Sequence, residues 1–170
     1  GGRLLVTGGE GGLITDSPAL DPLKAILPVR FPKTKKKEQV PLAVVYCLDS
    51  SDSMAGGAKF ELAAAALSNS LQLLPEQAEV GVVNFADFPS WAYPLQPFEG
   101  ANPIIDAMTS VKVRGGTSIY HALQSAYTTL KESKALVKHV VLLSDGQSTT
   151  TFTRSGDIVT AMARNKITVT

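Results

Sequence analysis

The sequence predicts an α/β fold in which a doubly wound, mostly parallel sheet is flanked by helices on both faces. Stretches typical of strands alternate with stretches of helical periodicity from residue 42 onward. The first strand stretch, Leu42–Leu48, is a continuous apolar run, as expected where both faces of a strand are covered. Polar residues follow it directly, at the edge of such sheets where ligands bind.

The first 37 residues are predicted to form an extension and a linker. Arg3–Thr7 has the composition of a short strand, and Asp21–Ile26 begins like a capped helix with proline at its first position. Gly8–Gly12 lacks the spacing of a phosphate-binding loop. The basic run Lys33–Lys37 is typical of a solvated connector. We therefore expect a boundary between residues 37 and 38 and a domain over 38–170.

Within that domain, apolar periodicity and turn residues predict the order of the elements. The expected strands are Leu42–Leu48, Glu79–Phe85, a turn and edge strand over Phe88–Pro94, His139–Leu143 and Ile167–Thr170. The expected helices are Lys59–Leu74, Asn102–Met108, Ser118–Glu132 and Ser155–Asn165. Because Pro89 and Pro94 cannot donate to a central ladder, the third strand is expected at the edge of the sheet.

Composition excludes several classes of function. The net charge is +1, from 16 Lys and Arg against 15 Asp and Glu, which gives no general attraction to nucleic acid or to a membrane surface. The longest apolar run is shorter than the ~20 residues of a spanning helix, so no membrane insertion is expected. The single cysteine, Cys47, lies in the first buried strand and is expected to be a core residue.

Oxygen-bearing side chains stand at the expected strand ends and at one helix start. Asp49, Ser51 and Ser53 form D-x-S-x-S after the first strand, Thr117 follows two glycines at the start of a helix, and Asp145 follows the apolar run ending at Leu143. Oxygen ligands without imidazole or thiolate suit a hard cation, Mg²⁺, Mn²⁺ or Ca²⁺, rather than zinc.

These three pieces, in this order, resemble the metal-ion-dependent adhesion site of von Willebrand factor type A domains. The resemblance covers roughly Val40–Thr170. It implies a Rossmann-like fold and a non-enzymatic module for adhesion or assembly, which binds a partner protein's Asp or Glu carboxylate. Asp52 stands where the family often has glycine. Type A domains also usually continue through a further strand and a closing helix, beyond the strand at which this sequence stops.

The balance of donors suits such a binding role. If Ser51, Ser53 and Thr117 bind the ion directly, and Asp49 and Asp145 act mainly through waters, few formal negative charges touch the ion. The ion then keeps most of its positive charge and an open position for a carboxylate from another molecule.

The opening GGRLLVTGGEGG…PLKAILPV resembles the tail of a glutamine-amidotransferase-like unit. Such a unit precedes a type A domain in some large bacterial membrane-anchored proteins. This second resemblance implies an extracytoplasmic part of a membrane-anchored, multidomain protein.

Two other functions remain open from the sequence. A hydrolase could use Ser51 with His121 or His139 and Asp145, although Ser51 lacks the G-x-S-x-G elbow. A degenerate type A domain could instead serve interdomain packing.

Overall fold

The computed structural model describes residues 40–146 and 152–170, and these form a five-stranded sheet with helices on both faces. The strands are β1 (Leu42–Asp49), β2 (Glu79–Phe85), β3 (Pro89–Pro97), β4 (Val137–Leu143) and β5 (Ile167–Val169), in the spatial order β3-β2-β1-β4-β5. β1 is central and runs parallel to β2 and β4, β5 is parallel to β4, and β3 is antiparallel to β2. The predicted fold class is confirmed.

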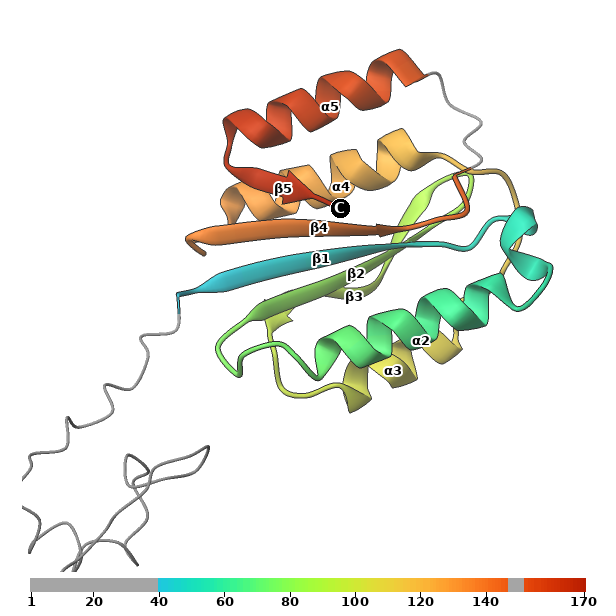
Figure 1. Ribbon diagram of the computed structural model, residues 1–170, viewed down its shortest axis with the longest axis horizontal. Coiled ribbons are helices and arrows are strands. Elements are labelled where there is room, and N and C mark those ends of the chain that lie inside the picture. The colour runs from blue at the N-terminus through green and yellow to red at the C-terminus, as the bar shows by residue number, and fades with distance from the viewer. Residues whose placement is uncertain (1–39, 147–151) are drawn as a thin grey trace, which may run out of the picture. The chain divides into compact units, whose positions relative to one another are not determined.

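Helices cover the two faces of the sheet in pairs (Figure 1). The helical segments are the 3₁₀ turn η2 (Asp52–Ala55), α2 (Lys59–Leu71), α3 (Asn102–Thr109), α4 (Ile119–Glu132) and α5 (Phe152–Arg164). α2 and α3 lie on one face, and α4 and α5 lie on the other. This two-layered covering explains why the strands are apolar runs rather than alternating patterns.

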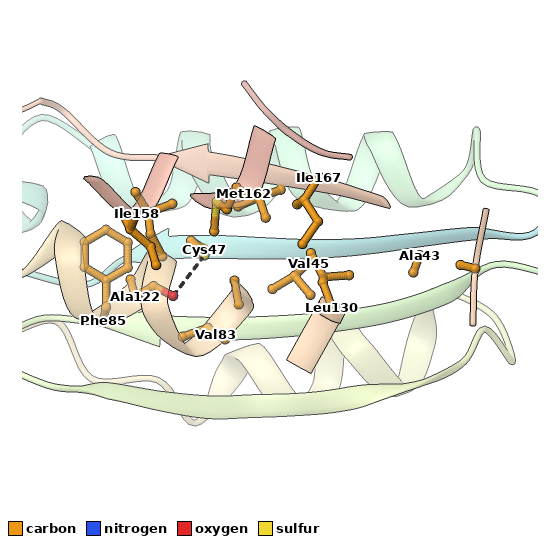
Figure 2. Packing of buried hydrophobic residues seen from close by; sticks show 14 residues of the cluster. Ala43, Val45, Cys47, Val83, Phe85, Ala122, Leu130, Ile158, Met162 and Ile167 are labelled. Carbon is orange, nitrogen blue, oxygen red and sulfur yellow. Dashed lines mark hydrogen bonds between the residues drawn. The ribbon is translucent and has the colours of Figure 1, made fainter. Parts of the chain in front are cut away.

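Alternate residues of β1 point into the two cores. Ala43, Val45 and Cys47 pack in the cluster under α4 and α5, part of which is drawn in Figure 2. The intervening residues Val44, Tyr46 and Leu48 pack in the cluster under α2 and α3. Every residue from Ala43 to Asp49 is buried, so the prediction that both faces of this strand are covered is confirmed.

β3 lies at the edge of the sheet, as its prolines predict. Its Trp91 packs against β2 at Gly81, where an added Cβ would come within 2.8 Å of the indole Cζ3 atom and 3.1 Å of the Leu95 backbone. Glycine at this position therefore makes room for the indole ring.

α2 ends earlier than predicted, at Leu71 rather than Leu74. After Leu71 the backbone changes to tighter bonds between residues three apart, such as Leu73 N–H to Ser70 O and Leu74 N–H to Leu71 O. Pro75 disfavours the α conformation only in the residue before it, Leu74, so the change after Leu71 begins before the proline acts. The other predicted boundaries differ from the observed ones by up to three residues.

The elements predicted for residues 1–37, and the boundary after them, lie outside the described residues. Within the part that the structure describes, none of the helices has the length and apolar character needed to cross a membrane.

Candidate metal centre

The candidate site lies at the carboxyl ends of the two central strands. Asp49 is the last residue of β1, and Asp145 follows β4 by two residues. The parallel register pairs Leu48 with Leu143, so the residue after Leu143, Ser144, lies beside Asp49. Register thus brings together residues that are 95 positions apart in the sequence.

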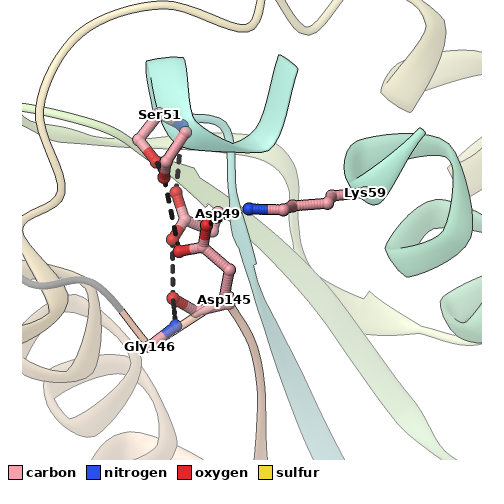
Figure 3. A network of polar contacts seen from close by, with 7 residues as sticks. Asp49, Ser51, Lys59, Asp145 and Gly146 are labelled. Carbon is pink, nitrogen blue, oxygen red and sulfur yellow. Dashed lines mark hydrogen bonds and ion pairs between the residues drawn. The ribbon is translucent and has the colours of Figure 1, made fainter. Parts of the chain in front are cut away.

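A chain of hydroxyls links the D-x-S-x-S loop to Asp145 (Figure 3). Ser53 Oγ donates to Asp145 Oδ1 at 3.3 Å, and the hydroxyls of Ser51 and Ser53 lie 3.0 Å apart. Because Ser53 has one hydroxyl hydrogen and gives it to Asp145, the hydrogen between the two serines comes from Ser51. The lone pairs of Ser51 Oγ therefore stay available as a ligand.

Asp49 is fully buried and is held by two donors. The Ser51 backbone N–H donates to Asp49 Oδ1 at 2.9 Å, and Ser144 Oγ donates to Asp49 Oδ2 at 2.6 Å. Ser144 in turn accepts the Gly146 N–H at 3.1 Å. These bonds orient a carboxylate that would otherwise be costly to bury.

Thr117 lies in a loop that is tied to the first one. The Arg114 N–H donates to Ser50 O at 2.8 Å, and the Asp52 N–H donates to Gly115 O at 2.9 Å. Gly115 has φ +96°, which favours glycine. Thr117 itself is 4% exposed, two residues beyond this junction. The structure thus brings Asp49, Ser51, Ser53 and Asp145 together by direct hydrogen bonds, and it joins the loop of Thr117 to theirs by backbone bonds.

Two residues that the sequence did not single out belong to this cluster. Ser144 orients Asp49 by a hydrogen bond. The sequence feature that could have identified Ser144 is its position directly before Asp145, at the end of a strand parallel to β1. Lys59, the first residue of α2, places its Nζ 2.8 Å from Asp145 Oδ2. Nothing in the local sequence around Lys59 indicates this partner, which lies 86 residues away.

The donor set is short of carboxylates but rich in hydroxyls. Within residues 40–146 and 152–170, no three His, Cys, Asp or Glu residues are grouped so that they could hold a metal ion. The oxygens gathered here come from two carboxylates and from serine hydroxyls, which suits a hard dication supplemented by water. The residues present therefore fit a divalent cation.

A recess of about 650 Å³ opens beside the loops of Ser50 and Gly115. Its lining includes the aromatic residues Phe88 and Trp91, the exposed cationic residues Lys112 and Arg114, and one carboxylate, Asp87. Phe88 is 79% exposed. The surroundings of the site thus offer apolar and positively charged surface to a second molecule.

Both histidines of the chain have hydroxyl partners other than Ser51. His121 Nδ1 lies 2.6 Å from Ser118 Oγ, and His139 Nδ1 lies 2.6 Å from Thr168 Oγ1. Ser51 Oγ instead bonds to Ser53. A Ser51 hydrolase needs a histidine hydrogen-bonded to the serine hydroxyl. Both histidines are hydrogen-bonded to other hydroxyls.

Comparison with known proteins identifies relatives of the chain. The family model described as "von Willebrand factor type A domain" matches residues 44–147, well over half of the chain. The human collagen alpha-1(XXI) chain is 33% identical over 114 residues, which cover 64% of this chain and 12% of that protein. The chain therefore corresponds to a small part of the length of this relative.

Solved structures share the fold at low sequence identity. A von Willebrand factor type A protein from Catenulispora acidiphila superposes with a TM-score of 0.67 at 21% identity, covering 77% of this chain and 32% of that one. Proximal thread matrix protein 1 from the mussel byssus, "with zinc occupied MIDAS motif", superposes with a TM-score of 0.63 at 19% identity. The match covers 76% of this chain and 35% of the mussel protein chain.

Proposed function

Because the von Willebrand factor type A family model matches most of its length, the chain belongs to this family, and we propose that it binds a partner protein's carboxylate through a divalent cation. The observation that carries the proposal is the hydrogen-bonded cluster at the ends of β1 and β4, in which Ser51, Ser53 and Asp145 form one chain of oxygens. The mussel protein with a zinc-occupied motif of this type supports divalent metal binding on the same fold.

Asp49, Ser51, Ser53, Thr117 and Asp145 are the residues proposed to hold the ion. A bound Mg²⁺, Mn²⁺ or Ca²⁺ would supply a positive centre with a position open to an oxygen anion. The hydroxyls would contact the ion without neutralising it. Asp49, fully buried and held by two donors, would fix the first loop rather than reach out toward a partner.

The partner is proposed to present an Asp or Glu side chain to the ion. The recess beside the site would receive the partner's neighbouring residues. Its two cations, Lys112 and Arg114, outnumber its one carboxylate, Asp87, and so favour an acidic segment there. Phe88, largely exposed at the rim, offers apolar contact area. The origin in a bacterial membrane-anchored, multidomain protein and the domain boundary after residue 37 stay predictions.

Thermal melting during Mg²⁺ or Mn²⁺ titration tests ion binding. We expect the melting temperature of the wild-type protein to rise with ion concentration, by mass action on the folded state. Asp49→Asn and Ser51→Ala should abolish this rise, whatever their own melting temperatures. Asp52→Asn is the matched control, because it removes a carboxylate from the same loop at an exposed position. The melting temperature of this variant should still rise with ion concentration. A flat response of the wild-type protein would favour the interdomain-packing alternative.

Selection from a displayed peptide library tests the partner's chemistry. Peptides enriched in the presence of Mg²⁺ should contain an Asp or Glu that cannot be replaced by Asn or Gln, and chelator should release them. Peptides that bind equally well in chelator, or equally well to Asp49→Asn, would contradict metal-mediated capture.

A further inference from the structure

Lys59 is a positively charged residue that contacts the cluster proposed to bind a cation. Its ammonium lies 2.8 Å from Asp145 Oδ2, so the two side chains form an ion pair. The Lys59 side chain is 44% exposed and that of Asp145 is 12% exposed, so the contact lies at the mouth of the site. Both carboxylate oxygens of Asp145 are therefore engaged, one by Ser53 and one by Lys59.

The position of Lys59 in its helix makes this contact more informative. Lys59 is the first residue of α2, where the helix dipole disfavours a positive charge. The preceding Ala58 adopts a left-handed conformation, φ +59°, which turns the chain into the helix. A lysine held against the dipole at this turn, with its ammonium on Asp145, indicates a role tied to that carboxylate.

We propose that Lys59 sets the ion affinity of the site by competing with the cation for Asp145. In the absence of the ion, the ammonium offsets the negative charge of Asp145, one of the two carboxylates in the cluster. When the ion binds, Lys59 gives up Asp145 and its charge opposes the dication. The inference rests on the proposed function, and it adds a residue that tunes the site without ligating the metal.

The direct test is calorimetric titration of Mg²⁺ and Mn²⁺ into the wild-type protein and three variants. Lys59→Met should bind the ion roughly tenfold more tightly, the size expected when a unit charge 2.8 Å from a proposed ligand is removed from a partly exposed site. Lys59→Arg keeps the charge and should stay within about threefold of wild type. Lys134→Met, an exposed lysine before the amino end of β4, makes the same change in net charge away from the site and should have no effect.

These variants separate the two proposals. Ion binding by wild type with equal affinity in Lys59→Met overturns this inference and leaves the proposed function intact. Equal tightening in Lys134→Met also overturns it, because the effect would then be one of net charge. No ion binding in any of the proteins would overturn the proposed function, and this inference with it.

A double-mutant cycle in chelator tests the pair without any ion. The urea midpoints of wild type, Lys59→Met, Asp145→Asn and the double variant should be non-additive by a few tenths molar, as expected for a partly exposed ion pair. The cycle cancels the separate effect of Lys59 on the helix dipole. Additive midpoints would show that the ammonium does not act on Asp145, and would overturn the inference.

Discussion

Ser144→Ala is the most informative perturbation of the site, because Ser144 joins the fold to the proposed ion-binding loop. Its hydroxyl donates to Asp49 Oδ2 at 2.6 Å, and Asp49 is 0% exposed. Removing a hydrogen bond to a buried charged group typically costs about 1.5–3 kcal/mol. We therefore expect the free energy of unfolding to fall by about this amount in chelator.

Urea denaturation measures this loss. With a slope of about 2 kcal/mol per molar urea, the midpoint should fall by about 1 M while the slope stays unchanged. Ser110→Ala is the matched control: its hydroxyl bonds to Ala107 O within an exposed helix end, and its midpoint should change little. A loss below about 0.5 kcal/mol in Ser144→Ala, inside the range of ordinary surface substitutions, would refute the claim that this bond holds Asp49.

The same variant should also weaken ion binding. Ser144 is not a proposed ligand, but it orients one, and residues that orient metal ligands typically contribute roughly 10–100-fold in affinity. Calorimetric titration of Mg²⁺ should show this loss. Unchanged affinity in a folded Ser144→Ala protein would mean that Asp49 does not contribute through its orientation.

Three further predictions concern the rest of the described fold. Burial raises the pKa of the Cys47 thiol to about 12, so the native protein should not react with a thiol-disulfide reagent near neutral pH, whereas the urea-unfolded chain should react rapidly. Gly81→Ala should lower the free energy of unfolding by about 1–3 kcal/mol, because the added methyl group meets Trp91, while Gly56→Ala, with nothing within 4 Å, should cost little in the same denaturation assay. Burial lowers the pKa of His139 below 6.5, so the unfolded chain binds the proton more readily; stability should fall as the pH drops from 6.5 through the folded-state pKa, and thermal melts of His139→Gln should lack this component.

The general architecture was predictable because its signals are local. An apolar run such as Leu42–Leu48 must be covered on both faces wherever it lies in the fold, and Pro89 and Pro94 exclude their strand from the centre of any sheet. The D-x-S-x-S loop follows its strand directly, so its place at the sheet's carboxyl edge required no knowledge of distant contacts. Boundaries were less predictable: Pro75 predicted a helix through Leu74, but the backbone changes to bonds between residues three apart after Leu71.

Covalent order alone indicates which residue types lie at the site, whereas the packing of distant elements sets how those residues act on one another. The residues following one strand are set by covalent order, so Asp49, Ser51 and Asp145 could be named without coordinates. The contact of Ser144 with Asp49 depends on the register of β1 and β4. The contact of Lys59 with Asp145 depends on the left-handed turn before α2. Such contacts between residues about 90 positions apart leave no trace in local periodicity, because they arise only when two strands and a helix pack together.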